Sequence, residues 1–415
     1  MVGIEYSDFV DLGYTPNDDE LVCEFYIEPA EGLSMEDAAG RVASESSNGT
    51  WAELQVEGRV ADISATAFDI DGNTIQVAYP PEDFELGNMP QILSAIAGNI
   101  MGMKAVDQIR LQDCDWPKTI VESFKGPQFG SSVRNEIFDA GDRPITATVP
   151  KPKVGLTSKQ HAEVGYKAWT GGVDLLKDDE NLTNQSFNRF DTRIEKSFKK
   201  RDKAEQETGE KKSYLVNITA DTETMLERAE MVKEHGGEYI MVDIVTTGWG
   251  ALQTVREKAD ELGLAIHAHR AMHAAFDRVP THGVSMRCIA QFARIIGVDQ
   301  LHTGTANLGK MDNEDTKGIN EWLRSDLYGH KDVLPVPSGG LHAGILPKVV
   351  EELGSNICVQ VGGGVHGHPG GTSAGAKALR QAIDATMAGE DIHDYAETHE
   401  ELKKALDKWG HETPR

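Results

Sequence analysis

The feature of this sequence that most limits its possible folds is a strand-then-helix pattern that repeats eight times after residue 143. Short apolar runs predict buried strands over residues 144–149, 173–176, 214–219, 239–243, 265–269, 300–302, 334–337 and 357–361. After these runs the apolar residues take a helical spacing, as they do over 225–232, 252–262 and 376–387. Eight such units in about 290 residues predict a parallel TIM (β/α)8 barrel, in which the chemistry lies on the loops that follow the strands.

The chain before residue 126 has a different pattern, in which strands and helices are mixed. Strands are predicted over 21–27, 52–56, 60–70, 74–79 and 106–111, and helices are predicted to begin at Ser34 and at Gln91. This mixture predicts a smaller α+β domain of the ferredoxin-like type. We therefore expect an α/β chain with an N-terminal α+β domain, residues 1–125, and a C-terminal barrel domain, residues 126–415.

The strand predicted at 173–176 is followed by an unusual group of charges. Lys177, Asp178, Asp179 and Glu180 come directly after it, so a lysine and two carboxylates are expected where the strand ends. Two close carboxylates repel each other unless a cation lies between them. Oxygen-only ligands suit a hard ion such as Mg2+. A lysine fits there if its neutral amine has added CO2, because the carbamate supplies a third oxygen ligand. The string alone also fits an exposed charged loop.

Basic side chains follow two other predicted strands. Lys151 and Lys153 flank a proline after the first strand, and His267 and His269 alternate along the fifth strand, before Arg270. Taken alone, the two lysines also fit a solvated loop, and the histidine pair also fits a zinc site. No third nitrogen or sulfur ligand stands nearby in the sequence, and Arg270 suits a phosphate better than a metal.

Glycine-rich loops follow the last three predicted strands. His302 ends the sixth strand, and the glycine-flanked loop after it carries Lys310, which is the pattern of a hinged lid with a cation. Ser338-Gly339-Gly340 and Gly362-Gly363-Gly364 end the seventh and eighth strands. Glycines let backbone N–H groups approach a phosphate closely, and these two barrel loops are the usual phosphate site. Gly-Gly alone is also a common turn.

Together these motifs resemble those of the large chain of ribulose-bisphosphate carboxylase, Rubisco, and most closely its archaeal form III branch. The resemblance runs from about Glu20 to past Gly371. Residues 172–180 are similar to the activation motif G-x-D-F-x-K-x-D-E, with Leu175 in place of Phe. Gly370 stands where the family has Trp. The loop that carries Lys310 has one residue more than the plant pattern.

Two further motifs of the resemblance lie in the first domain. They are Glu45-Ser46-Ser47-Asn48-Gly49-Thr50-Trp51 and Gly98-Asn99. Taken alone, each would be a capped loop. In the family these residues reach into the active site of the neighbouring subunit. The resemblance therefore implies a homodimer as the smallest working unit, with a larger oligomer of dimers as a further option.

The resemblance implies carboxylation of ribulose 1,5-bisphosphate with CO2 and water to two 3-phosphoglycerates, with oxygenation by O2 as a side reaction. The reaction would pass through an enediolate held on Mg2+. The implied metal ligands are Lys177 as N6-carboxylysine, which needs an activating CO2, with Asp179 and Glu180. The implied catalytic residues are Lys151, Lys177, His269 and Lys310. The implied substrate-binding residues are Glu45, Thr50, Trp51, Asn99, Lys153, Arg270, His302, Ser338, Gly339, Gly340, Gln360, Gly362 and Gly363.

The roles that the resemblance implies for the lysines separate the carboxylase from two rivals. The Lys177 carbamate would remove the first proton, Lys151 would return a proton after cleavage, and Lys310 would stabilise the carboxylate formed from CO2. A Rubisco-like enolase or isomerase would use the same barrel and metal without fixing CO2, and it normally lacks several of these residues. A non-catalytic sugar-phosphate sensor would need no lysine among metal ligands.

Composition limits the partners and the location. Asp and Glu number 67 against 41 Lys and Arg, a net charge of −26, which argues against nucleic acid or an anionic membrane as partner. The acids are spread over the whole chain, so we interpret them as a salt-adapted surface. The four cysteines form no CxxC pair, and no basic leader or apolar run of about 20 residues occurs. The protein is expected to be soluble and cytoplasmic.

Overall fold

The computed structural model describes residues 2–3, 6–49, 55–56, 63–309 and 315–413. The chain forms two compact units. One comprises Met1–Gly126, Met272–Ile296 and Leu327–His330, and the other comprises Pro127–Ala271, Gly297–Asp326 and Lys331–Arg415. The division of the chain into folding domains at residues 125 and 126 stays a prediction.

Eight parallel strands form the sheet of the second unit. They are β7 (Ile145–Thr148), β8 (Leu175–Lys177), β9 (Ser213–Asn217), β10 (Tyr239–Asp243), β11 (Ala265–His269), β13 (Gln300–His302), β14 (Leu334–Val336) and β15 (Cys358–Gln360). Their order is β14-β13-β11-β10-β9-β8-β7-β15, so the last strand pairs with the first. An isolated bridge between Ser338 and Gln360 joins the two ends of this order. The predicted TIM barrel is confirmed.

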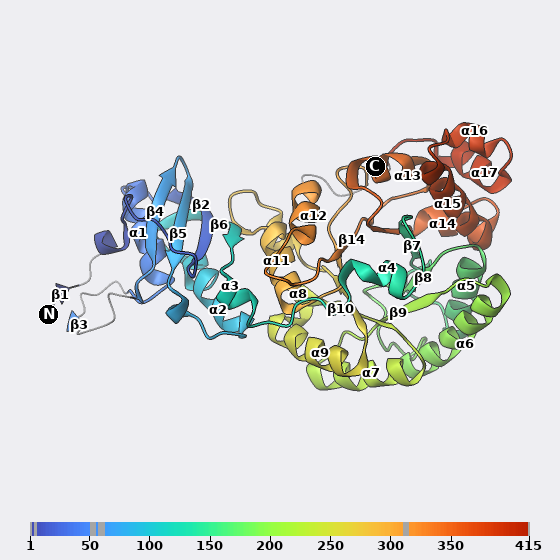
Figure 1. Cartoon of the computed structure of the whole chain (residues 1–415), viewed down its shortest axis with the longest axis horizontal. Helices are drawn as coiled ribbons and strands as arrows, with labels where there is room; N and C mark the ends of the chain where they lie inside the picture. Colours follow the sequence, from blue (N-terminus) through green and yellow to red (C-terminus); the bar gives the residue numbers. More distant parts are fainter. Residues whose placement is uncertain (1, 4–5, 50–54, 57–62, 310–314, 414–415) are drawn as a thin grey trace. The chain divides into compact units, whose positions relative to one another are not determined.

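Helices cover the outer side of this sheet (Figure 1). The longer ones are α5 (Ser158–Thr170), α6 (Phe190–Thr208), α7 (Thr222–Glu234), α9 (Trp249–Leu262), α12 (Thr316–Arg324), α13 (Leu346–Leu353), α15 (Gly371–Ala388) and α17 (Glu400–Trp409). Shorter ones are α4 (Val133–Glu136), α8 (Ile244–Thr247), α14 (Gly363–His366) and α16 (Ile392–Ala396), with 3-10 turns at Gly130–Ser132 and Ala343–Ile345. Because both faces of the strands are covered, all five residues of β10 are buried, and the sequence there is continuously apolar up to Asp243.

The bounds of the barrel strands agree with the apolar runs to within two residues. The predicted strands at 239–243, 265–269 and 300–302 have the observed bounds. The strand predicted at 173–176 begins later, at Leu175, because the side chain of Asp174 is held at its start by Arg143 and Thr146. It also ends one residue later, at Lys177, so the lysine itself belongs to the strand.

A five-stranded sheet forms the first unit, in the order β12-β6-β2-β5-β4. Its strands are β2 (Leu21–Pro29), β4 (Thr66–Asp71), β5 (Thr74–Tyr79), β6 (Val106–Asp115) and β12 (Gly283–Val284). Its helices are α1 (Met35–Glu45), α2 (Met89–Ile96), α3 (Lys118–Val121), α10 (Ala274–Asp277) and α11 (Met286–Ile296), with 3-10 turns at Tyr6–Phe9, Pro81–Asp83 and Asn99–Gly102. The order β6-β2-β5-β4, with antiparallel neighbours and one helix after β2 and one after β5, is the predicted ferredoxin-like arrangement.

Local signals in the first unit are confirmed in part. Ser34 caps α1 and forms a capping box with Asp37. Of the strands predicted at 52–56 and 60–70, the structure describes β3 (Gln55–Val56), which pairs with β1 (Val2–Gly3), and β4. The remainder of the predicted segment at 52–56, and residues 60–62, lie outside the described residues. None of the described helices has the length and hydrophobicity of a membrane span.

Candidate active site

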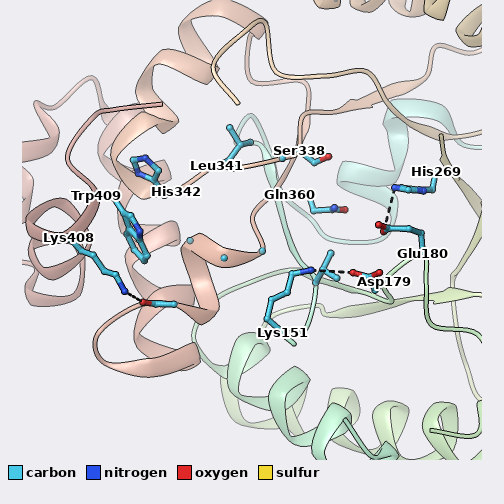
Figure 2. Close-up of a pocket in the computed structure, with 17 residues that line it drawn as sticks. Lys151, Asp179, Glu180, His269, Ser338, Leu341, His342, Gln360, Lys408 and Trp409 are labelled. Carbon is cyan, nitrogen blue, oxygen red and sulfur yellow. Dashed lines mark hydrogen bonds and ion pairs between the residues drawn. The ribbon is translucent and has the colours of Figure 1, made fainter. Parts of the chain in front are cut away.

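A cavity of about 540 Å³, lined by polar and apolar residues, lies at the carboxyl ends of the barrel strands (Figure 2). The predicted site residues that line it are Lys151, Asp179, Glu180, His269, Ser338, Gly339, Gly340, Gln360, Gly362 and Gly363. They come from the ends of β7, β8, β11, β14 and β15, because parallel strands bring all their carboxyl ends to one edge of the barrel. Residues far apart in the sequence therefore share one site.

Lys177 ends β8 and is buried, with 1% of its side chain exposed. Its Nζ donates a hydrogen bond to the backbone oxygen of Asp178 at 2.9 Å and lies 3.7 Å from Oε2 of Glu180. Burial lowers the pKa of the Lys177 ammonium, against the opposing effect of the carboxylates of Glu180 and Asp179. The amine is therefore more easily deprotonated than an exposed lysine, as addition of CO2 requires.

The two carboxylates after β8 each face a cationic group. Nζ of Lys151 donates to Oδ2 of Asp179 at 3.2 Å, and Oε2 of Glu180 faces Lys177. Burial alone would raise the pKa of Asp179, but hydrogen bonds from Asn181 and the charge of Lys151 outweigh it and lower that pKa. For Glu180 burial is likewise outweighed, by the charges of Lys177 and His269. Both carboxylates are therefore ionised and able to bind a cation.

The donor set at this position fits a hard metal ion only if it gains a further oxygen. Among the described residues, no three acidic, histidine or cysteine side chains are grouped so as to hold a metal. Asp179 and Glu180 supply oxygens, and two ammonium groups stand where a cation would lie. A carbamate on Lys177 would replace one of these positive charges by an oxygen ligand. With that change the residues present fit Mg2+.

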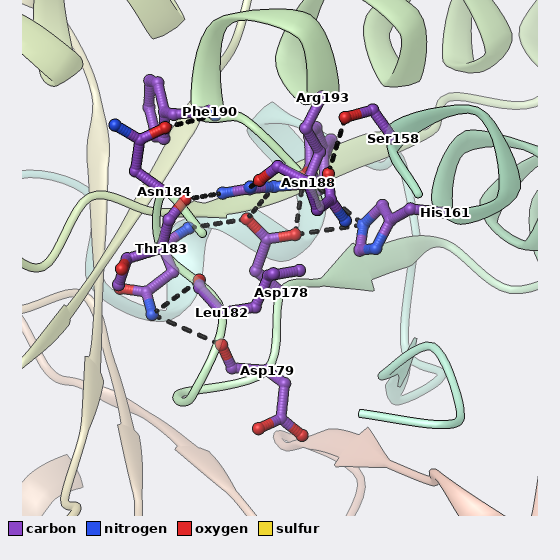
Figure 3. Close-up of polar contacts among 12 residues, drawn as sticks. Ser158, His161, Asp178, Asp179, Leu182, Thr183, Asn184, Asn188, Phe190 and Arg193 are labelled. Atoms are coloured by element: carbon purple, nitrogen blue, oxygen red, sulfur yellow. Dashed lines mark hydrogen bonds and ion pairs between the residues drawn. The ribbon is translucent and has the colours of Figure 1, made fainter. Parts of the chain in front are cut away.

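Asp178 lies between Lys177 and Asp179 in the sequence, but its side chain points the opposite way from that of Asp179 (Figure 3) and does not line the cavity. It is fully buried, and its carboxylate contacts the side chains of Arg193, Tyr214 and His161 and the backbone of Asn217. Nε of Arg193 lies 3.2 Å from Oδ2, and the Tyr214 hydroxyl donates to Oδ1 at 2.6 Å. His161 Nε2 is 3.1 Å from Oδ1, and the Asn217 N–H donates to Oδ2 at 3.1 Å.

These contacts fix the turn that carries the two cavity carboxylates. Burial opposes the charge of Asp178, but Arg193 and His161 outweigh it and lower the pKa of this carboxyl to about 2. The side-chain amide of Asn217 also donates to the backbone oxygens of Asp179 and Glu180, both at 3.3 Å. Asp178 therefore fixes the turn from its buried side, while Asp179 and Glu180 line the cavity.

Three histidines lie close together on β11 and β13, and of these His269 lines the cavity. The His302 ring lies 4.8 Å from the His267 ring and 4.9 Å from the His269 ring, between centroids. His269 Nδ1 hydrogen-bonds to Asp243 at 2.7 Å, which directs Nε2 toward Glu180, 3.6 Å away. Burial lowers the pKa of both His267 and His302 far below the ordinary value, so these two rings are neutral.

Hydrogen bonds to the protein account for the remaining Nδ1 atoms of this group. His267 Nδ1 lies 3.0 Å from Oε1 of Gln300, and His302 Nδ1 lies 2.7 Å from the hydroxyl of Ser338. Nε2 of His267 and Nε2 of His302 are buried without a hydrogen-bond partner in the described structure. His267 and His269, the pair found in the sequence, thus hydrogen-bond to Gln300 and Asp243 within the barrel.

The glycine loops after β14 and β15 pack directly on each other. A Cβ on Gly364 would lie 2.5 Å from the backbone oxygen of Leu341, so glycine is required there. A Cβ on Gly363 would meet nothing within 4 Å, and the same holds at Gly339, whose φ is +103°. The loops therefore leave open space beside their backbones, as a phosphate cradle requires.

Other predicted site residues lie elsewhere. Arg270 and His302 are buried outside the cavity lining, and Lys153 is exposed. Asn99 Nδ2 donates to Oε1 of Glu45 at 3.4 Å, within the first unit. Thr50, Trp51 and Lys310 lie outside the described residues.

The cavity also contains residues that no motif in the sequence indicated. They include His342, which follows the glycine loop after β14, and Lys408 and Trp409, which end α17. The sequence signal for the last two was slight, an aromatic residue beside a lysine at the end of an amphipathic helix.

A parallel barrel with a cavity at the carboxyl ends of its strands is the architecture of a barrel enzyme. Paired carboxylates, lysines and a glycine cradle in that cavity suit an anionic, oxygen-rich substrate. Residues 130–409 match the family described as the ribulose bisphosphate carboxylase large chain, catalytic domain, and residues 8–120 match its N-terminal domain. The chain belongs to the family of ribulose bisphosphate carboxylase large chains.

Archaeal proteins are among its relatives. A ribulose bisphosphate carboxylase of Pyrococcus furiosus is 52% identical over 417 residues, which cover 99% of each chain. One of Methanosarcina barkeri is 48% identical over 423 residues, covering 97% of this chain and 99% of that protein. The crystal structure of octameric Rubisco from Pyrococcus horikoshii in complex with sulfate has a TM-score of 0.96 at 50% identity and covers 99% and 98% of the chains. Dimeric archaeal Rubisco from Hyperthermus butylicus has a TM-score of 0.91 at 45% identity and covers 98% and 99%.

Proposed function

We propose that this chain carboxylates ribulose 1,5-bisphosphate with CO2 and water to two 3-phosphoglycerates, with oxygenation by O2 as a side reaction, and that it is of the archaeal form III type. The observation that carries the proposal is the position of Lys177. Its amine is buried at the end of β8, has a lowered pKa and faces Glu180, with Asp179 beside it. A structural lysine would have no reason to end a barrel strand among carboxylates that face the cavity.

Activation would convert Lys177 from a cationic to an anionic group. The neutral amine forms an N–C bond to CO2 and releases one proton, which leaves a carbamate. The carbamate, Asp179 and Glu180 would hold Mg2+. When bound, Mg2+ would supply Lewis acidity for polarising the substrate carbonyl and stabilising negative charge on its oxygen.

The other residues of the cavity would bind the substrate and move protons. We assign removal of the first proton to the carbamate of Lys177, and return of a proton after carbon–carbon cleavage to Lys151, whose ammonium faces Asp179. His269, oriented by Asp243, would assist hydration. Lys310 would stabilise the carboxylate formed from CO2.

Phosphate binding is assigned to opposite sides of the barrel mouth. The backbone N–H groups of the glycine loops would hold one phosphate, together with Thr50 and Trp51 of a neighbouring subunit. Arg270 and His302 would hold the other, and Ser338 would contact a substrate hydroxyl. Lys153 and Gln360 would also bind the substrate.

We also propose a homodimer as the minimal assembly, with Glu45 and Asn99 serving the neighbouring subunit's barrel. The octameric and dimeric archaeal relatives support a homo-oligomer. We further propose that the protein is salt-adapted, which the net charge of −26 supports, and that it is cytoplasmic. The form III type suggests that the substrate derives from nucleotide ribose phosphate.

The function is tested by incubating the purified chain with ribulose 1,5-bisphosphate, Mg2+ and 14C-labelled bicarbonate. Label should appear in 3-phosphoglycerate, and Lys177→Met should abolish it because no carbamate can form. Lys167→Met, a change on the outer helix α5, is the control and should keep the activity. Turnover of a sugar phosphate without incorporation of label would instead indicate an enolase or isomerase.

A further inference from the structure

The end of the C-terminal helix α17 forms one wall of the cavity. Lys408 and Trp409, the last two residues of this helix, line the cavity together with His342 and the glycine loop around Gly363 (Figure 2). This wall lies beside the glycine cradle, and the carboxylates Asp179 and Glu180 lie across the cavity from it. The wall therefore borders the part of the cavity suited to an anion.

Lys408 is a cation without a carboxylate partner among the described residues. Its Nζ donates to the backbone oxygen of Gly367 and lies 5.0 Å from the centroid of the Trp409 ring. Several other lysines on exposed helices of the chain pair with an acid, as Lys404 does with Glu400 on the same helix. Lys408 therefore places at the cavity edge an ammonium whose contacts are a carbonyl and an aromatic face, with no acid to neutralise it among the described residues.

Trp409 holds this lysine at the cavity edge. Its indole stacks on the ring of His342, with centroids 5.9 Å apart and planes 27° apart. A Cβ on Gly367 would lie 3.6 Å from Cζ2 of Trp409, so the indole covers that glycine closely. His342 is in turn held by a hydrogen bond of 2.9 Å between its Nε2 and the backbone oxygen of Glu412. The wall is thus packed, while the ammonium on its long side chain is free to change its acceptor.

We propose that Lys408 binds the phosphate group that lies on the glycine loops, exchanging its hydrogen bond to Gly367 for an ion pair with the phosphate. Trp409 supports the side chain during this exchange. The glycine loops themselves offer a phosphate only neutral N–H groups. Lys151 lies against Gly362, so Lys408 would add a second cation beside the phosphate. That the phosphate belongs to ribulose 1,5-bisphosphate rests on the proposed function, whereas recognition of a phosphate dianion does not.

The experiment compares Lys408→Met with two matched variants, Lys404→Met on the same helix and Lys408→Arg. Three quantities are measured for each protein: the Kd of inorganic phosphate, by calorimetry, and the KM and kcat for ribulose 1,5-bisphosphate. Lys408→Met should raise both Kd and KM by about three- to tenfold, the range for one partly exposed charge pair, with kcat changed less than twofold. Lys404→Met and Lys408→Arg should stay within twofold of the unmodified protein.

The salt dependence of Kd and KM distinguishes a direct charge interaction from a merely structural role of Lys408. Because the pair is partly exposed, the difference between Lys408→Met and the unmodified protein should shrink as KCl rises from about 0.3 M to about 3 M. Equal Kd and KM in the two proteins, or the same change in Lys404→Met, would overturn the inference. If neither the unmodified protein nor any variant forms phosphoglycerate, but Lys408→Met alone has the raised Kd for phosphate, the proposed function is wrong and the role of Lys408 in phosphate binding is supported.

Discussion

Replacing Asp178 by asparagine should weaken both the stability of the chain and the binding of metal at its neighbours. Asp178 is fully buried and contacts Arg193 and Tyr214. Asparagine has nearly the same volume and keeps one acceptor oxygen, but it removes the negative charge. Arg193, which is also buried, then has no ionised partner at this position.

The magnitude follows from the pKa of Asp178. Its folded-state pKa is about 2, below the ordinary value of 3.8, and a shift of that size is worth about 2.5 kcal/mol. Because the folded pKa is depressed, this stabilisation is present at neutral pH and is lost as the pH falls from about 4 to about 2. Leaving a buried charge without its partner costs about 3–5 kcal/mol. We therefore expect Asp178→Asn to lose about 3 kcal/mol at pH 7, and the loss to vanish toward pH 2.

A matched control stands at the other end of the same strand. Asp174 precedes β8, is equally buried, and accepts two hydrogen bonds of 2.7 Å from Arg143. Burial opposes its charge, but Arg143 outweighs this effect and lowers the pKa of its carboxyl. Asp174→Asn should destabilise the protein by a similar amount, without touching the turn that carries Asp179 and Glu180.

The assay separates stability from metal binding. Thermal unfolding should show a lower midpoint for both variants. Trapping of labelled CO2 on Lys177 as a function of Mg2+ concentration, measured without substrate, should require at least fivefold more Mg2+ for Asp178→Asn only. Two results would refute the reasoning: the same increase in the required Mg2+ for Asp174→Asn, or no increase for Asp178→Asn. Either would mean that Asp178 does not position the turn that carries Asp179 and Glu180.

Three other predictions concern the whole site. In buffer below about 0.3 M salt, where the Debye length exceeds roughly 5 Å, the charge of −26 should cause loss of assembly or activity, which sedimentation and turnover assays would detect. Unchanged sedimentation in dilute buffer would exclude the salt-adapted interpretation. Mixing inactive Asn99→Ala subunits with inactive Lys177→Ala subunits should restore activity, since one site of a mixed dimer carries no lesion. No recovery after verified exchange would place the whole site in one chain. Lys310→Ala should still exchange the carbon-3 proton of the substrate with solvent while carboxylation falls at least a hundredfold, the effect of one electrostatic stabiliser. Loss of proton exchange would contradict this role.

The barrel could be predicted because its strands are buried on both faces. Apolar runs such as residues 239–242 stand out from the helical segments between them, so the bounds of the strands were predicted to within two residues. The charged residues 177–180 could be predicted as a site for the same reason, because they directly follow an apolar strand in the sequence. The glycine loops after β14 and β15 were found through their composition.

Contacts that form only in the folded chain could not be predicted. The partners of Asp178 come from α5, α6 and β9, and nothing in the local sequence relates His161, Arg193 or Tyr214 to it. The two-residue strand β12 pairs with β6 across more than 170 positions and is too short to give a pattern. Lys408 and Trp409 lie at the end of an amphipathic helix, and only the packing of α17 brings them to the cavity.

The pairing of β15 with β7 determines when the site can form during synthesis. Ile145 and Cys358 are partners in this ladder although they lie 213 positions apart, and closing a loop of that length costs roughly 5 kcal/mol of chain entropy. A nascent chain that has left the ribosome only as far as residue 350 has the carboxylates after β8 but neither the closing strand nor the glycines behind it. The cavity is therefore completed late in translation, once β15 has paired with β7.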